Sequence, residues 1–275
     1  MKNNFDITGK VVLITGGSGL MGRAHAEAVA EFGAIPVIGD IDLSPAGNIL
    51  ESIEKNTGVK GDFVELDVTS SNSVNKALEK LTSAYKQIDV LINNAALNPS
   101  VSNKSHDSKE WSRFEDFSVD VWNKDLEVGL TGAFLCSQIV GNHMKENKNG
   151  VIINIASDLA LIAPDQRIYR IEGLSEDMQP VKPISYSVVK AGLVALTKYL
   201  AVYWADHGIR VNALCPGGIY DNQDIEFVNK LSDLIPMGRM AEPSEYKSAV
   251  VFLCSEASRY MTGSCLTIDG GRTVW

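Results

Sequence analysis

Short apolar, β-branched runs alternate along the chain with longer stretches whose apolar residues recur every three to four positions. The short runs predict strands at 11–15, 35–39, 63–66, 90–92, 151–155, 210–214 and 265–268. The longer stretches predict helices at 20–32, 46–55, 71–85, 119–145, 184–207, 224–233 and 243–254. Strands that alternate with helices form right-handed crossovers, so the pattern predicts an α/β fold with a mostly parallel sheet. Runs such as VVLIT and VIINIA are apolar throughout, which suits a sheet with helices on both faces.

The 275 residues would fill one large α/β domain or two small ones. Since no Pro- or Ser-rich linker interrupts the alternation, we expect a single domain over residues 1–275. Two irregular stretches, 98–118 and 161–183, contain apolar as well as polar residues. Loops of this length in a compact domain are usually functional or disordered. We favour substrate lids over disordered insertions for both, and 161–183 is a candidate substrate-loop insertion.

Composition restricts the classes of partner. The formal net charge of −9 disfavours nucleic acid, because an acidic surface repels polyanions. The chain has no apolar run of about 18 residues to span a membrane, and its first ten residues lack a signal-peptide pattern. The four cysteines lie too far apart in sequence for a metal-ligand pair. We therefore expect a cytoplasmic protein with reduced thiols, no metal site and a small-molecule substrate.

A glycine-rich turn connects the first predicted strand to the first predicted helix. It reads T-G-G-S-G-L-M-G over residues 15–22, and Gly17, Gly19 and Gly22 satisfy G-x-G-x-x-G. Glycines let the backbone amides approach a pyrophosphate, which the helix N-terminus also attracts. The alternative is a tight turn without a ligand. The candidate dinucleotide-binding residues here are Gly16, Ser18, Gly19, Leu20, Met21 and Gly22.

An acidic residue follows the second predicted strand at the position expected for ribose recognition. Asp40 lies 18 residues beyond Gly22, and a carboxylate there accepts hydrogen bonds from the adenosine ribose hydroxyls. It would repel a 2′-phosphate, and no Lys or Arg follows within a few positions. The sequence therefore predicts NAD rather than NADP, with Ile41 beside the cofactor. Asp42 competes for the same role, and a turn or helix-cap role for Asp40 remains the alternative.

Tyr186 is the one tyrosine of the eight with a lysine, Lys190, four residues on. On a helix these two residues share a face. A neighbouring ammonium favours the phenolate, so Tyr186 can exchange a proton with an alcohol or a carbonyl. Ser157 follows a predicted strand and is a candidate to hold the substrate oxygen. A helix-cap or strand-end role is the alternative for this serine.

The ordered motifs resemble those of the short-chain dehydrogenase/reductase family over essentially the whole chain. The matches are T-G-G-S-G-L-M-G at 15–22, D-V at 67–68, N-N-A-A at 93–96, Ser157, Y-S-V-V-K at 186–190, P-G-G at 216–218 and D-G-G at 269–271. The resemblance implies a doubly wound, seven-stranded Rossmann fold and homodimers or homotetramers. It also implies cofactor-binding roles for Asp67 and Val68 at the adenine, Asn93 and Ala95 beside the cofactor, Pro216, Gly217, and Ile219 near the carboxamide.

Three features depart from the family pattern. Leu20 occupies the middle glycine of T-G-x-x-x-G-x-G, a register that resembles the nucleotide-sugar branch. Gly129 stands where the family usually has a catalytic asparagine that supports a water in the proton relay. Between Ser157 and Tyr186 the chain is longer than usual, and the extra residues include Arg167 and Arg170. These arginines are candidates to bind an anionic substrate group, or else lie on a solvated surface insertion.

With this insertion the chain is also similar to oxidoreductases of flagellin-glycosylation and nonulosonic-acid pathways, which implies a sugar or nucleotide-sugar substrate. The leading hypothesis is an NAD(H)-dependent oxidoreductase that transfers a hydride between the nicotinamide and a secondary alcohol or carbonyl. One alternative is a nucleotide-sugar epimerase or dehydratase that recycles NAD. A second is a non-catalytic NAD-binding protein, which Gly129 motivates.

Overall fold

The sheet and its covering helices are seen in a computed structural model, which describes residues 3–97 and 112–275. Seven strands of the described chain form one sheet in the order β3-β2-β1-β4-β5-β6-β7, and every neighbouring pair is parallel. Their bounds are β1 Val11–Thr15, β2 Ile35–Asp40, β3 Asp62–Glu65, β4 Val90–Asn93, β5 Gly150–Ile155, β6 Ile209–Pro216 and β7 Cys265–Ile268. The predicted fold class is confirmed, and the sheet is entirely rather than mostly parallel.

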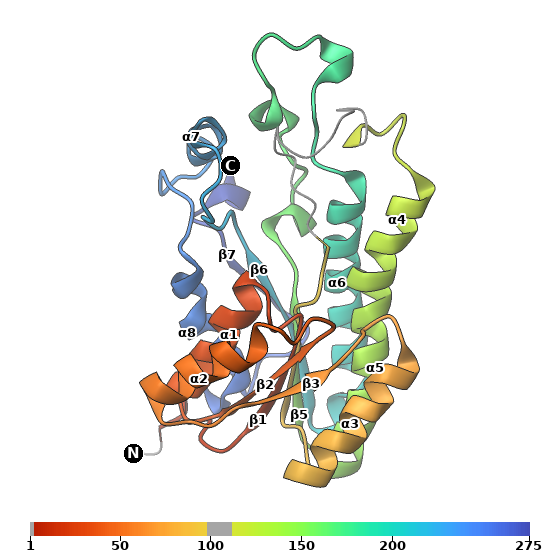
Figure 1. The fold of residues 1–275 in the computed structure, drawn as a ribbon, viewed down its shortest axis with the longest axis vertical. Coiled ribbons are helices and arrows are strands. Elements are labelled where there is room, and N and C mark those ends of the chain that lie inside the picture. Colours follow the sequence, from red (N-terminus) through yellow and green to blue (C-terminus); the bar gives the residue numbers. More distant parts are fainter. Residues whose placement is uncertain (1–2, 98–111) are drawn as a thin grey trace.

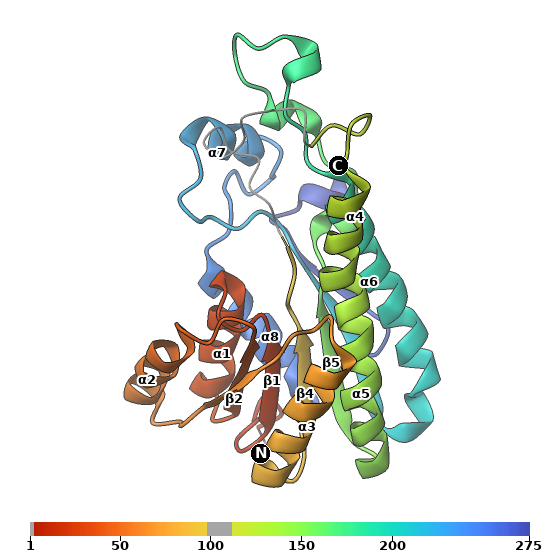
Figure 2. The same ribbon diagram turned by 45° about the vertical axis from the view of Figure 1, so that its right-hand side comes forward.

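Helices cover both faces of the sheet (Figures 1 and 2). On one face, α1, α2 and α8 pack against alternate strand residues such as Val12 and Ile14. On the other, α3, α5 and α6 pack against Val11 and Leu13. Burial on both faces explains why the strands are apolar throughout. The helix bounds are α1 Leu20–Glu31, α2 Ala46–Thr57, α3 Ser71–Tyr85, α4 Val119–Leu126, α5 Gly132–Asn147, α6 Ile184–Tyr203, α7 Ile225–Ser232 and α8 Lys247–Cys254.

The helix predicted over 119–145 is divided in the structure. A π-helical turn, Glu127–Thr131, separates α4 from α5. Two glycines at this junction pack closely on other elements: a Cβ on Gly129 would lie 2.6 Å from Val189 Cγ1, and a Cβ on Gly132 would lie 2.7 Å from Val68 Cγ2. Helical periodicity continues across the junction, so the sequence pattern does not reveal the change in hydrogen bonding.

The segment 161–183 extends beyond the sheet, on the side where α7 and the C-terminus also lie (Figures 1 and 2). It contains two short 3₁₀ helices, Gln166–Tyr169 and Glu176–Met178. The other predicted lid, 98–118, falls mostly outside the described residues. In the part of the chain that is described, no helix combines the length and apolar character needed to cross a membrane.

The strand order reverses between β1 and β4, because β2 and β3 lie on one side of β1 and β4 to β7 lie on the other. Such a switch point leaves a crevice at the carboxyl ends of the strands, where α/β proteins bind ligands. This edge carries the glycine turn after β1, Asp40 at the end of β2 and Ser157 after β5.

Candidate active site

A cleft of about 720 Å³ runs along the carboxyl edge of the sheet. It begins at the glycine turn and ends beyond Tyr186, under the segment 161–183. Most of the predicted site residues line it: Gly16, Gly19, Leu20, Met21, Asp40, Ile41, Asp67, Val68, Ala95, Ser157, Tyr186, Lys190, Pro216, Gly217 and Ile219. The structure thus brings together residues that are up to about 200 positions apart, since Gly16 and Ile219 line the same cleft.

The positions of the turn require glycine for different structural reasons. A Cβ on Gly22 would lie 2.3 Å from the Gly16 carbonyl oxygen, so Gly22 lets α1 pack against the turn. Gly16 has a φ of +61° and lies against Ala95. Gly19, by contrast, has only an ordinary 3.5 Å contact and opens onto the cleft. Part of the glycine pattern is therefore explained by packing, and Gly22 itself does not line the cleft.

Asp40 connects the glycine turn to the end of β2. Its Oδ2 accepts a hydrogen bond from the Ser18 backbone N–H at 2.9 Å, and Oδ1 accepts one from the Asp42 N–H at 3.2 Å. The Asp42 carboxylate turns to its own loop, where hydrogen bonds with Ser44 lower its pKa. Asp40 rather than Asp42 therefore lines the cleft. Ser18 does not line it, since its hydroxyl donates to the Asp42 carbonyl oxygen.

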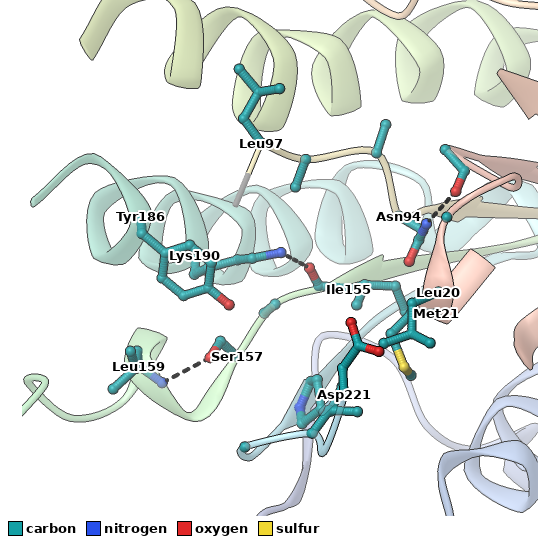
Figure 3. Close-up of a pocket in the computed structure, with 18 of the residues that line it drawn as sticks. Leu20, Met21, Asn94, Leu97, Ile155, Ser157, Leu159, Tyr186, Lys190 and Asp221 are labelled. Atoms are coloured by element: carbon teal, nitrogen blue, oxygen red, sulfur yellow. Dashed lines mark hydrogen bonds between the residues drawn. The ribbon is translucent and has the colours of Figure 1, made fainter. Parts of the chain in front are cut away.

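The N-N-A-A run places its second asparagine, not its first, beside the cleft. Asn93 is buried among polar side chains and donates from Nδ2 to Ser137 Oγ and Asn154 Oδ1. Asn94 lines the cleft, and its Nδ2 donates to the carbonyl oxygens of Thr15 and Gly16, each at 3.0 Å (Figure 3). Asn93 thus supports the sheet, whereas Asn94, which the sequence analysis missed, holds the glycine turn. Its adjacency to Asn93 was the available signal.

Helix α6 presents Tyr186 and Lys190 to the cleft, as the spacing predicts (Figure 3). Lys190 Nζ donates to the Ile155 carbonyl oxygen at 2.7 Å and lies 5.7 Å from the centroid of the Tyr186 ring. Burial lowers the pKa of Lys190 to about 8. Burial raises the pKa of Tyr186, and a hydrogen bond with Ser157 opposes that rise. Burial therefore favours the protonated phenol over the phenolate.

Ser157 lies at the end of β5 and faces Tyr186 from the other side of the cleft (Figure 3). Its hydroxyl donates to Asp158 Oδ1 at 2.8 Å and accepts from the Leu159 N–H at 3.2 Å. The hydroxyl thus caps the 3₁₀ turn Asp158–Ala160 while it also contacts Tyr186. Ser157 therefore caps the turn and also faces the cleft, although the sequence pattern suggested these two roles as alternatives.

The space next to Gly129 is filled from α6. Val189, one residue before Lys190, occupies the position that a side chain at 129 would need. A separate cavity of about 10 Å³ remains, lined by Asp125, Gly129, Tyr186, Val189 and Lys190 among others. That volume is roughly enough for one water molecule. The site behind the tyrosine therefore has Val189 packed against Gly129, and it keeps room for a water.

The two arginines of segment 161–183 do not line the cleft. Arg167 is 79% exposed and pairs with Asp165 at 2.6 Å, and Arg170 pairs with Glu176 at 2.7 Å. Such short local pairs satisfy the guanidinium groups at the surface. The same segment instead contributes Ile168, Tyr169 and Lys182 to the cleft.

Two further cationic residues lie at this end of the cleft, and the sequence analysis missed both. Lys182 Nζ lies 3.9 Å from the centroid of the Tyr186 ring. Arg272, near the C-terminus, donates from Nη1 to Asp158 Oδ2 at 2.8 Å in a buried ion pair. No sequence signal identified Arg272, because it lies 114 positions from Asp158, whereas Lys182 lies only four residues before Tyr186. No cluster of His, Cys, Asp or Glu that could hold a metal ion occurs within residues 3–97 and 112–275.

The arrangement fits a dinucleotide, since Gly19 opens onto the cleft at the start of α1 and leaves the backbone of the turn accessible there. The comparisons with known proteins agree. The family model described as short chain dehydrogenase matches residues 10–226. The chain is 33% identical to the 3-oxoacyl-[acyl-carrier-protein] reductase FabG of Aquifex aeolicus, over 96% of this chain and 98% of that protein.

Similar relatives also include an NAD-dependent glycerol dehydrogenase of Listeria innocua, which is 30% identical over 98% of this chain and 96% of that protein. Among solved structures, a gluconate 5-dehydrogenase from Burkholderia cenocepacia in complex with NADP and tartrate superimposes with a TM-score of 0.85. It is 28% identical, and the match covers 99% of this chain and 98% of that one.

Proposed function

This chain belongs to the short-chain dehydrogenase/reductase family, in its single-domain branch, and from that premise we propose that it uses NAD(H) to interconvert a secondary alcohol and its ketone on a small polyhydroxylated substrate. The chain is an oxidoreductase that acts on alcohol or carbonyl groups. The observation that carries the proposal is the convergence of Ser157, Tyr186 and Lys190 in the cleft that also contains the glycine cradle.

The proposed chemistry divides the work between cofactor and protein. A bound nicotinamide ring supplies the site that accepts or donates the hydride. Tyr186 receives the hydroxyl proton when the alcohol is oxidised and returns it when the ketone is reduced. Lys190 has a pKa of about 8, so it is mostly protonated at neutral pH and its charge favours the phenolate. Ser157 faces the phenol and holds the substrate oxygen beside it.

The preference for NAD rests on Asp40. Its carboxylate lines the cleft and is fixed by two backbone N–H groups. A 2′-phosphate at this position would meet a fixed negative charge, and residues 41–45 contain no Lys or Arg to offset it. Named relatives include an NAD-dependent enzyme as well as structures with NADP. The carboxylate of this chain therefore supports NAD.

The substrate class is inferred from the named relatives. Several similar proteins carry the names of polyol or sugar enzymes, among them a D-threitol dehydrogenase and a glucose 1-dehydrogenase. The alternative of a nucleotide-sugar enzyme rested on the spacing of the glycine turn, in which Leu20 replaces the middle glycine of the usual pattern. Leu20 opens α1 and lines the cleft without altering the single-domain architecture, so the register does not favour that alternative.

The test is an assay of glycerol, threitol, sorbitol and gluconate with NAD and NADP, and of the matching ketones with NADH and NADPH. We expect kcat/KM with NAD to exceed that with NADP by about tenfold or more. The Asp40→Ala variant should lose about tenfold in kcat/KM for NAD and little for NADP. A wild-type preference for NADP would contradict the cofactor proposal. Binding of NADH without turnover of any alcohol or carbonyl would instead support the non-catalytic alternative.

A further inference from the structure

An ion pair is buried at the substrate end of the cleft, next to the residues that carry the proposed reaction. Arg272 Nη1 donates to Asp158 Oδ2 at 2.8 Å, and the two side chains are only 7% and 3% exposed. Both residues line the cleft, as Ser157 and Tyr186 do. A buried ion pair rarely stabilises a fold more than apolar side chains of similar volume would. The position of this pair therefore points to a role in the site itself.

The D-G-G motif near the end of the chain directs Arg272 into the cleft. Asp269 Oδ1 accepts a hydrogen bond from the Gly271 N–H at 2.9 Å, and Oδ2 accepts one from the Thr273 N–H at 2.8 Å. Gly271 has a φ of +92°, a backbone conformation that other residues rarely adopt. A short 3₁₀ helix begins at the next residue, Arg272. The motif thus forms a closed turn that fixes the backbone from which the guanidinium reaches Asp158.

The Asp158 carboxylate also holds the Ser157 hydroxyl. Ser157 Oγ donates to Asp158 Oδ1 at 2.8 Å and accepts from the Leu159 N–H at 3.2 Å. A hydroxyl has one proton and two lone pairs. Since Asp158 takes the proton and the Leu159 N–H takes one lone pair, the second lone pair remains for the cleft. Ser157 therefore accepts a hydrogen bond there, from the substrate hydroxyl or from the phenol of Tyr186, which faces it (Figure 3).

The same carboxylate acts on the phenol through its charge. Burial is the main cause of the raised pKa of Tyr186, and the negative charge of Asp158 raises it further. Arg272 is bonded to that carboxylate, so its positive charge opposes the effect of Asp158 on the phenol. Without the guanidinium, the pKa of Tyr186 would rise and less phenolate would form at neutral pH.

We propose that Asp158 and Arg272 act together as positioning residues of the reaction. Asp158 fixes the direction of the Ser157 hydroxyl, and Arg272 neutralises Asp158 beside the phenol. The inference rests on the proposed oxidoreductase function and adds two residues to its machinery. The two roles are separable, because the orientation of Ser157 affects the rate at every pH, whereas the charge affects the pH at which Tyr186 releases its proton.

Other ionisable groups of the described chain also face Tyr186. Lys182 Nζ and Lys190 Nζ lie 3.9 Å and 5.7 Å from the centroid of its ring. Asp125 of α4 lines the small cavity that Tyr186 also lines, and the phenol of Tyr169 lies close enough to interact with it electrostatically. These groups are present in every variant that changes the ion pair, so differences between those variants report the pair alone.

The experiment measures kcat for oxidation of the best neutral polyol with NAD as a function of pH. Arg272→Met should move the acid limb to higher pH by about one unit, so that kcat falls about tenfold on that limb and recovers at higher pH. Asp158→Asn keeps an acceptor for Ser157 but leaves Arg272 unpaired, so it should move the limb to lower pH. Arg272→Lys, and the neutral double variant Arg272→Met, Asp158→Asn, should return close to the wild-type profile.

A second comparison isolates the orientation of Ser157. The double variant Arg272→Met, Asp158→Asn retains an oxygen that accepts from the Ser157 hydroxyl, whereas Arg272→Met, Asp158→Leu does not. The Leu form should have a kcat about tenfold lower than the Asn form at every pH. Both forms lack an unpaired buried charge, so they remain informative if the single variants fail to fold. Equal kcat in the two forms would overturn the role of Asp158.

Arg239→Met is the matched control, because it removes an arginine that pairs with Glu245 at 2.6 Å outside the cleft. Its pH profile should follow the wild type. If Arg272 instead contacts the substrate directly, Arg272→Met would raise KM without moving the pH profile, and Asp158→Asn would not relieve the loss. That result, or shifts of the two single variants in the same direction, would overturn the proposal.

A titration without turnover separates failure of this proposal from failure of the proposed function. Difluorotyrosine incorporated in place of tyrosine has a lower phenol pKa, and its ¹⁹F NMR signal follows ionisation. The signal of Tyr186 is the one that Tyr186→Phe lacks. We expect its pKa to rise by about one unit in Arg272→Met and to fall by about one unit in Asp158→Asn. These shifts would support the pair even if no alcohol were oxidised. A Tyr186 titration that neither variant moves would refute the pair even if polyols were oxidised.

Discussion

The two ends of the cleft are built in different ways. At the cofactor end, backbone groups of one short turn, residues 15–22, are positioned by close glycine contacts and by the Asp40 carboxylate. At the substrate end, side chains from distant segments meet: Ser157 after β5, Lys182 before α6 and Arg272 near the C-terminus. The first end depends on backbone shape, and the second depends on side-chain charge. Substitutions at the cofactor end should therefore weaken binding mainly through steric clashes. Substitutions at the substrate end should act mainly through changes in charge.

The strongest steric test is Gly22→Ala. Its Cβ would lie 2.3 Å from the Gly16 carbonyl oxygen and 2.6 Å from Gly17 Cα, so α1 must move relative to the turn. Overpacking of this kind typically costs about 1–3 kcal/mol, and we expect the Kd for NADH to rise by roughly 100-fold. Isothermal titration calorimetry measures this Kd. Gly47→Ala, on α2 and outside the cleft, is the control, because a Cβ there would meet nothing within 4 Å. Equal losses in both variants would refute the steric explanation.

Acid should destabilise the cofactor end through His25 on α1. Its ring is buried, neither ring nitrogen has a hydrogen-bond partner among the described residues, and burial lowers its pKa to about 4. The unfolded chain takes up a proton near pH 6.5, whereas the folded chain does so only near pH 4. Stability is therefore present above pH 6.5 and falls as the pH decreases toward 4, by up to about 3 kcal/mol from this group.

Urea denaturation at pH 7, 5.5 and 4 checks this prediction. His25→Leu should lose less stability than the wild type between pH 7 and pH 4, because the buried apolar side chain takes up no proton. If His25→Leu has the same pH dependence as the wild type, His25 is not responsible for the acid sensitivity.

Gly129 tests the packing behind the catalytic helix. A Cβ at this position would lie 2.6 Å from Val189 Cγ1, so Gly129→Ala should lower the free energy of unfolding by about 1–3 kcal/mol. Val189→Ala removes the clashing methyl groups, and the double variant should recover most of the loss that Gly129→Ala causes alone. A double-mutant cycle by urea denaturation measures this coupling. Strict additivity of the two effects would contradict the assigned contact.

The smallest effect is expected at the two surface arginines. Arg167 and Arg170 pair with Asp165 and Glu176 outside the cleft. Exposed pairs contribute about 0–1 kcal/mol to stability, so the Arg167→Ala, Arg170→Ala double variant should retain kcat/KM within about twofold. Steady-state rates with the preferred substrate check this. A large rise in KM would show that these residues contact the substrate.

The contrast between the two ends also explains what the sequence could predict. Alternating strands and helices predicted the parallel sheet, and local motifs led to the glycine turn, Asp40 and the Tyr186–Lys190 pair, because each lies within one element or turn. Asn94 and Arg272 were missed, since their contacts join distant segments, whereas Lys182 was missed although Tyr186 lies only four residues on. Arg167 and Arg170 fail for a different reason: a basic residue in an insertion shows its charge in the sequence, but not that nearby Asp165 and Glu176 already pair with it.

The central claim is that Tyr186 transfers the proton while the glycine cradle holds the cofactor independently. Single-turnover hydride transfer in Tyr186→Phe, followed by the change in NADH absorbance, tests it most directly. We predict that the Kd for NADH stays within about threefold of the wild type while the transfer rate falls by at least about 100-fold. A variant that binds NADH normally and still transfers hydride at close to the wild-type rate would contradict the account.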